Sequence, residues 1–218
     1  KQIWPFCKKG KGYKKSGPLA YVNKDIMTLW FKILVACIPA AVVGVLFNDE
    51  LDALFYHWYV VAAALIVFGV AFIVVENWNK GKHPKVTQLS QLTYKAALII
   101  GVFQLIAAVF PGTSRSGATI VGALLIGISR PVAAEFTFFL AIPVMFGASL
   151  LKIVKFGFAF STVELAALLV AMLVAFVVSV VVIKFLLSYI KKHDFKIFGW
   201  YRIILGILVI LYFSTRVL

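Results

Sequence analysis

The sequence Pro111-Gly-Thr-Ser-Arg-Ser-Gly-Ala-Thr119 is a polar stretch set between two apolar runs, Thr93–Phe110 and Ser116–Ile128. The second run has about 13 residues, which at 1.5 Å per residue is well short of a hydrocarbon core about 30 Å thick. Two half-length helices that enter and leave the membrane on the same side fit these lengths better than two crossings. The stretch therefore predicts a re-entrant helix pair over residues 93–128, with a polar loop within the membrane.

The composition indicates an integral membrane protein. Hydrophobic residues make up 63% of the 218 residues, which leaves too little polar surface to coat a water-soluble globule. Apart from the re-entrant pair, the runs that we expect to cross the bilayer are 27–47, 55–75, 132–152, 163–187 and 198–213. We therefore expect an all-α polytopic fold, a single membrane domain over residues 1–218 with about five transmembrane helices.

Basic residues gather in alternate connections between these runs. The formal net charge is +14, and most cations lie in residues 1–24, 80–95 and 184–202, whereas residues 48–54 are acidic. Cytoplasmic loops carry an excess of Lys and Arg, so the start of the chain is predicted to be cytoplasmic and Leu218 extracellular. Anionic lipid headgroups explain the charge more simply than nucleic acid, which is therefore not an expected partner.

The loop has the groups that hold a phosphate. Arg115 offers a bidentate cation, Ser114 and Ser116 offer hydroxyls, and the start of the next helix directs unpaired N–H groups at the loop. A guanidinium within a membrane is costly unless it meets an anion. We therefore predict catalytic roles for these three residues. The predicted substrate contacts are Gly112, Thr113, Gly117, Thr119, Gln104 and Glu135.

Structural interpretations of the same residues stay open. Arg115 can extend to the membrane surface or pair with a carbonyl, Gln104 can bond a neighbouring helix, and Glu135 can pair with Arg130. The spacing of Gly112–Thr119 matches a nucleotide-binding P-loop, but alanine stands where that motif has lysine, which excludes such a site. The residues supply charge neutralisation for a phosphoanhydride, but neither a general base nor a set of metal ligands.

Residues 101–119, Gly-Val-Phe-Gln-Leu-Ile-Ala-Ala-Val-Phe-Pro-Gly-Thr-Ser-Arg-Ser-Gly-Ala-Thr, resemble the second signature of bacterial undecaprenyl-diphosphatases, integral membrane enzymes linked to bacitracin resistance. The runs Glu135–Pro143 (EFTFFLAIP) and Phe198–Arg202 (FGWYR) are similar to the same family. The resemblance implies two inverted repeats, with two spans of the first in residues 26–75 and the second in residues 93–217. It also implies hydrolysis of undecaprenyl diphosphate to undecaprenyl phosphate and inorganic phosphate. That reaction recycles the lipid carrier for peptidoglycan synthesis in the bacterial plasma membrane.

The family's first signature, a glutamate-rich half-helix followed by a loop with serine and histidine, does not occur in this sequence. We therefore expect the chain to correspond to the carboxy-terminal three quarters of the family, with residues 1–24 as a cytoplasmic loop. The resemblance implies a divalent cation, Mg or Ca, with ligands in the missing part and none in this chain.

Two alternatives to the hydrolase stay open. One is a transporter or flippase of phosphorylated polyprenyl lipids, because broken helices in inverted repeats are a transporter architecture. The other is an inactive fragment of the phosphatase. The expected partners are a polyprenyl diphosphate lipid and the membrane, and the sequence leaves the oligomeric state open, a homodimer included.

Overall fold

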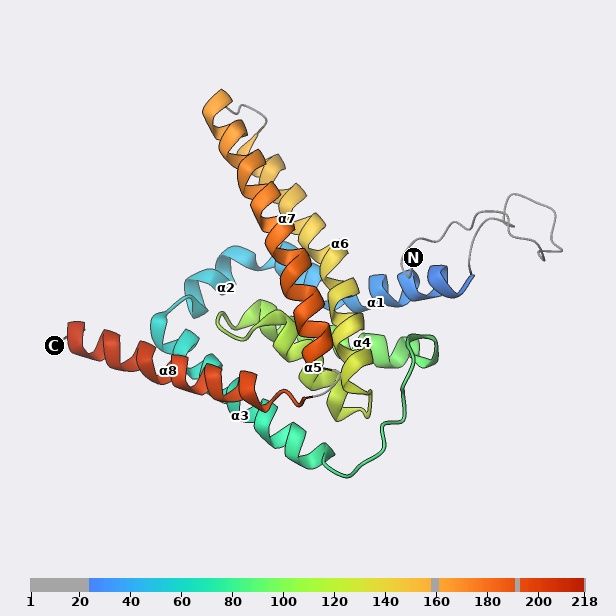
Figure 1. Ribbon diagram of the computed structural model, residues 1–218. Coiled ribbons are helices and arrows are strands. Elements are labelled where there is room, and N and C mark those ends of the chain that lie inside the picture. Colours follow the sequence, from blue (N-terminus) through green and yellow to red (C-terminus); the bar gives the residue numbers. More distant parts are fainter. Residues whose placement is uncertain (1–23, 158–160, 191–192, 218) are drawn as a thin grey trace, which may run out of the picture.

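The computed structural model describes residues 24–157, 161–190 and 193–217, and helices dominate these ranges (Figure 1). The elements in chain order are α1 (Lys24–Leu46), α2 (Asn48–Phe55), α3 (Trp58–Asn79), the 3-10 turn η2 (Leu89–Gln91), α4 (Tyr94–Val109), α5 (Arg115–Leu125), α6 (Arg130–Phe156), α7 (Thr162–Ile190) and α8 (Lys196–Val217). Within the described ranges, β pairing is limited to one isolated bridge between Val86 and Ile128. The all-α prediction is confirmed. The predicted cytoplasmic loop 1–24 falls almost wholly outside the described residues.

Five helices, α1, α3, α6, α7 and α8, are long and apolar enough to cross a membrane. Helices α4 and α5 have 16 and 11 residues, which correspond to about 24 Å and about 16 Å. They pack against each other as a pair of half-length helices. The prediction of about five spans is confirmed, and the two short helices agree with the predicted re-entrant pair. The division into inverted repeats stays a prediction.

Close backbone contact joins neighbouring helices. Helix α3 lies along α8, and α1 lies along α4 (Figure 1). A Cβ on Gly69 of α3 would lie 2.8 Å from the carbonyl oxygen of Gly199 of α8, and a Cβ on Gly199 would lie 2.7 Å from the carbonyl oxygen of Gly69. Small residues at such crossings matter because lipid supplies little hydrophobic force between helices, and van der Waals contact has to replace it.

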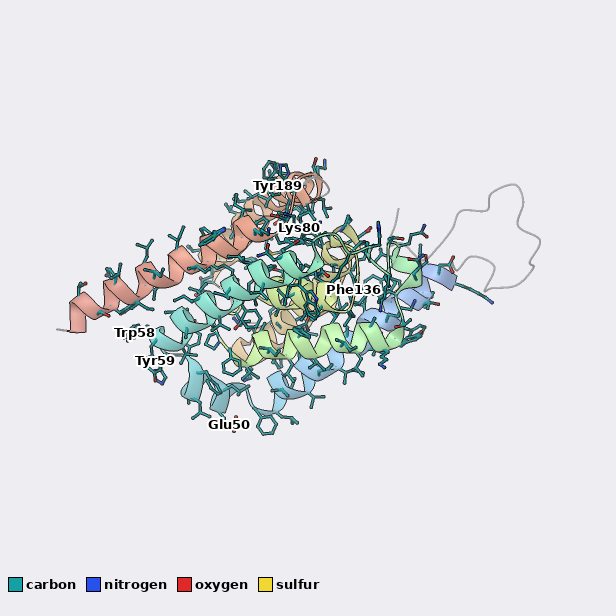
Figure 2. All side chains as sticks on the ribbon, turned by 90° about the horizontal axis from the view of Figure 1, so that it is seen from below. Glu50, Trp58, Tyr59, Lys80, Phe136 and Tyr189 are labelled. Carbon is teal, nitrogen blue, oxygen red and sulfur yellow. The ribbon has the colours of Figure 1, made fainter. Side chains whose placement is uncertain are left out.

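One cluster of buried side chains lies between α1, α4 and α6 and includes Phe136, which is fully buried and lies in the middle of the helices (Figure 2). A second cluster includes Phe72 of α3 and Ile120 of α5. By contrast, the second half of α6 and the first half of α7 run side by side and project away from the other helices (Figure 1). Only Ile190 is buried among the residues of α7. An apolar helix with this exposure suits contact with lipid tails.

Two sequence assignments need correction. The acidic connection 48–54 between the first two predicted spans forms the short helix α2. The span predicted over 55–75 ends too early, because α3 continues for one more turn to Asn79. Glu76 is tolerated within that helix because it has buried polar partners, described below.

The contact between α1 and α4 gives a direct test of helix packing. A Cβ on Gly101 would overlap the carbonyl oxygen of Ala36, a backbone atom that cannot rotate away. We expect Gly101→Ala to reduce the free energy of unfolding by about 1–3 kcal/mol because the added methyl group overpacks the contact. The measurement is the thermal unfolding midpoint in detergent, which should fall. Gly44→Ala in α1 is the control, because a Cβ there meets nothing within 4 Å. If both variants unfolded at the wild-type temperature, α1 and α4 would not be in the contact described.

Candidate functional site

The loop between α4 and α5 ends in a helix cap. The Ser114 hydroxyl accepts a hydrogen bond of 3.2 Å from the Gly117 N–H, the usual way in which serine satisfies one unpaired donor of a helix start. The hydroxyl oxygens of Ser114 and Ser116 are 3.2 Å apart, and both side chains are exposed. Helix α5 begins at Arg115, one residue before the predicted start. The structure therefore places the two hydroxyls together at the positive end of α5.

Arg115 is the first residue of α5, and it is half-buried. The ion pairs found among the described residues are Arg130–Glu76 and Lys196–Asp194, and neither includes Arg115. A guanidinium at this position, without a carboxylate from the described part of the chain, leaves its charge available for an anion. The roles predicted for Arg115, Ser114 and Ser116 stay predictions, and their geometry is compatible with them.

Two predicted contact residues are fully buried and lack bonds that their polar atoms could make. The Thr113 hydroxyl and the Gln104 side-chain nitrogen have no hydrogen-bond partner within the described residues. Each residue is 1% exposed. A buried polar group without a partner costs about 1–3 kcal/mol, so each calls for an explanation. Thr113 lies within the loop itself, and Gln104 lies in α4, about two turns before the loop.

Thr119 and Gly117, also predicted to contact the substrate, are buried with their polar groups already engaged. The Thr119 hydroxyl lies 3.1 Å and 3.0 Å from the carbonyl oxygens of Arg115 and Ser116, and 3.0 Å from the Thr137 hydroxyl of α6. The Gly117 N–H is used by the cap. The Gly117 bond therefore stabilises the first turn of α5, and the Thr119 hydroxyl connects this turn to α6.

Gly112 fixes the loop against α3. Its φ is +89°, a left-handed conformation that glycine adopts without strain. A Cβ at this position would also lie 2.7 Å from the carbonyl oxygen of Val61, in the first turn of α3. Both observations make glycine necessary for the close approach of the loop to α3.

Arg202 of α8 also reaches the loop, and sequence reasoning missed it as a site residue. Its Nη2 donates a hydrogen bond of 2.7 Å to the Gly112 carbonyl, and the residue is only 8% exposed. Its Nε has no partner among the described residues. In the sequence it was counted with the basic connection 184–202. The signal that could have found it is an arginine in the second turn of an apolar span, where a charge needs a partner.

We expect Arg202→Met to weaken diphosphate binding about tenfold or more, because a charge-assisted hydrogen bond that holds the loop carbonyl is lost. The measurement is the affinity of the detergent-solubilised chain for a short-chain polyprenyl diphosphate. Lys196→Met removes a partly exposed cation from the start of the same helix, and we expect it to bind as the wild type does. If Arg202→Met bound the lipid as tightly as the wild type and Lys196→Met do, Arg202 would have no influence on the loop.

A second buried cluster lies at the opposite end of α5, around Glu76. This carboxylate is 1% exposed and accepts two hydrogen bonds of 2.9 Å from Arg130 Nε, in addition to a contact with Arg130 Nη2. It also accepts a bond of 3.0 Å from the Phe195 N–H. Glu76 therefore joins the end of α3 to the start of α6 and to the segment that precedes α8.

The Glu76–Arg130 pair also corrects an interpretation of the sequence. The sequence allows Arg130 to pair with Glu135, but the carboxylate that Arg130 binds is Glu76. Glu135 lies in the second turn of α6 and is half-buried. Its predicted contact with the substrate stays a prediction.

The described residues do not by themselves fit the divalent cation that the resemblance implies. Within residues 24–157, 161–190 and 193–217, no group of three or more His, Cys, Asp or Glu side chains could hold a metal ion. Mg²⁺ and Ca²⁺ prefer carboxylate and carbonyl oxygens, whereas the side chains at the loop are hydroxyls and guanidinium groups.

Known proteins similar to this chain belong to the family that the loop motif resembles. Residues 1–208 match the family described as bacitracin resistance protein BacA. An undecaprenyl-diphosphatase of Desulfitobacterium hafniense is 63% identical over 209 residues, which cover 94% of this chain and 75% of that protein. An undecaprenyl-diphosphatase 1 of Clostridium acetobutylicum is 64% identical over 193 residues, 88% of this chain and 70% of that protein. An undecaprenyl-diphosphatase of Enterococcus faecalis is 57% identical over 210 residues, 96% of this chain and 74% of that protein.

These similarities extend along almost the whole chain. They agree with the half-length helices and with the arginine in the capped loop. The chain belongs to the bacitracin resistance protein BacA family.

Proposed function

We infer that this chain is an undecaprenyl-diphosphatase, which uses one water to hydrolyse undecaprenyl diphosphate to undecaprenyl phosphate and inorganic phosphate. Relatives that bear this name, at 57–64% identity, support the reaction. The structural observation that carries it is Arg115, which begins a half-length helix beside two exposed hydroxyls and has no carboxylate partner within the described residues. Hydrolysis of this lipid returns the carrier to peptidoglycan synthesis and gives resistance to bacitracin.

The loop favours this reaction chiefly through charge. Arg115 can bind two phosphate oxygens at once, the start of α5 adds its positive end, and Ser114 and Ser116 add hydroxyl donors. Donors fixed before the reaction stabilise the charge that develops on a phosphoryl group in the transition state. Arg202 holds the Gly112 carbonyl, which keeps the loop in place. The exposed apolar helices suit the polyprenyl tail.

The chain spans the membrane several times, and we propose that its amino end is cytoplasmic and its carboxyl end extracellular. The excess of basic residues near the end of α3 and the start of α8 supports this orientation. The loop contacts the first turn of α3 through Val61, and Phe110 packs on Phe55 with ring centroids 5.0 Å apart. In the proposed orientation these contacts put the phosphate site in the outer half of the membrane.

Dependence on a divalent cation is a proposal carried by the family resemblance alone. The test is phosphate release from undecaprenyl diphosphate, measured with Mg²⁺, with Ca²⁺ and with a chelator. One arm uses the 218-residue chain, and a second joins it to the amino-terminal residues of the Desulfitobacterium hafniense relative. We expect cation-dependent release in the second arm at least.

Two other results would contradict the hydrolase. Movement of the lipid between the leaflets of reconstituted vesicles, with no phosphate released in either arm, would identify a flippase. Binding of the lipid with neither movement nor release in both arms would leave the loop as a binding site without catalysis.

A further inference from the structure

A cavity of about 680 Å³ lies at the carboxyl end of α5, away from the loop at its amino end. It is lined by the end of α3, the connection after α3, the turn between α5 and α6, and the residues around the end of α7. Because α5 has 11 residues, the cavity and the loop are separated by about 16 Å along its axis. The cavity is therefore distinct from the phosphate site proposed above.

Most charged side chains that line the cavity are basic. Lys82, Lys85 and Arg130 are its cations, and Asp194 is its carboxylate. Arg130 is neutralised by Glu76, and Asp194 lies 3.8 Å from Lys196. Among the described residues Lys82 and Lys85 take part in no ion pair. The unbalanced charge of the cavity is therefore positive.

The backbone around the cavity is fixed by hydrogen bonds. The N–H groups of Lys85 and Val86 donate to the Gly127 carbonyl at 2.8 Å and 3.3 Å, and the Ser129 N–H donates to the Val86 carbonyl at 2.9 Å. The Asn79 side chain donates to the Leu124 carbonyl, one of the last in α5. The Leu124 and Gly127 carbonyls at the carboxyl end of α5 are therefore engaged, and they present less negative partial charge to the cavity.

The wall of the cavity also has an apolar part, formed by Trp78, Leu124, Ile126 and Ile190. The Lys82 ammonium lies 4.3 Å from the centroid of the Trp78 ring, a cation–π contact of the kind found at membrane interfaces. The end of α3, the start of α6 and the end of α7 meet here; a basic connection follows α3, and α6 begins with Arg130. This is the level at which the headgroups of the cytoplasmic leaflet lie in the proposed orientation.

We propose that this cavity binds the phosphate headgroup of an anionic phospholipid of the inner leaflet, with Lys82 and Lys85 as its main contacts. The positive charge selects a phosphate, and the apolar wall favours an amphiphile over free phosphate. Basic pockets between membrane helices bind anionic headgroups in this way.

The test measures retention of phosphatidylglycerol relative to phosphatidylcholine by the purified 218-residue chain, using native mass spectrometry after exchange into mixed micelles of both lipids. We expect the double variant Lys82→Gln/Lys85→Gln to lose the preference for phosphatidylglycerol by about tenfold or more. The control is the double variant Lys152→Gln/Lys155→Gln, which has the same net charge as Lys82→Gln/Lys85→Gln. It changes two exposed lysines at the other end of α6. It should keep the wild-type preference, and all three proteins should unfold at similar temperatures in phosphatidylcholine.

An equal loss in both double variants would show a general charge effect and overturn the proposal, as would an unchanged preference in Lys82→Gln/Lys85→Gln. Inorganic phosphate at millimolar concentration is the competing arm. If it displaced phosphatidylglycerol from the wild type, the cavity would be a site for free phosphate instead of a lipid headgroup. None of these readouts depends on phosphate release, so the proposal can fail while the proposed function stands.

Discussion

Replacing Arg115 with lysine is expected to lower kcat/KM for phosphate release about 100- to 1000-fold in the form of the protein that hydrolyses undecaprenyl diphosphate. Removal of one fixed donor from a site that stabilises developing charge has an effect of this size. Lysine keeps the positive charge, but its ammonium cannot make the two parallel bonds that a guanidinium makes to a phosphate. The assay is release of inorganic phosphate over a range of lipid concentrations.

Lys152→Gln is the control for this variant, because Lys152 is an exposed cation near the far end of α6. It should retain wild-type kinetics, and Arg115→Lys should keep the wild-type unfolding temperature. An Arg115→Lys enzyme that is folded and fully active would remove the loop from the mechanism.

Replacing Glu76 with alanine is expected to reduce the free energy of unfolding by about 1–3 kcal/mol, because the buried Phe195 N–H and the partly exposed Arg130 guanidinium would lose their acceptor. Unfolding is measured by a detergent or thermal titration. The double variant Glu76→Ala/Arg130→Met should recover part of the loss, because it leaves no unpaired charge behind.

Glu164→Gln is the matched control for Glu76. Glu164 is exposed at the start of α7, and its carboxylate accepts hydrogen bonds from the Ser161 N–H and hydroxyl, which an amide oxygen can also accept. We expect it to unfold close to the wild type. A Glu76→Ala protein as stable as Glu164→Gln would mean that the α3–α6–α8 junction does not depend on the buried carboxylate.

The sequence predicts the features that depend on length and local pattern. Long apolar runs specify the five spans because a bilayer has a fixed thickness, and the shortness of 116–128 indicates a half-length helix for the same reason. The polar loop predicts a helix start near Ser116, and α5 begins one residue earlier because the Ser114 hydroxyl caps its first turn. These signals are local, so one sequence suffices to read them.

Contacts between distant segments could not be predicted in this way. Glu76 and Arg130 are 54 residues apart, and Arg202 is 90 residues from Gly112. From the sequence, Arg202 belongs to the basic connection 184–202, and Arg130 is a candidate partner of Glu135, because both assignments follow from neighbours along the chain. What distinguishes them is burial against a partner, which depends on how the helices pack.

The most direct test of the account is an experimentally determined structure of the chain with bound undecaprenyl diphosphate, in which the distance from the Arg115 guanidinium to the nearest phosphate oxygen is measured. The account predicts a distance of about 3 Å, with the Ser114 and Ser116 hydroxyls directed at the same diphosphate. A diphosphate bound elsewhere, with Arg115 in bulk water or paired with a carboxylate, would contradict it.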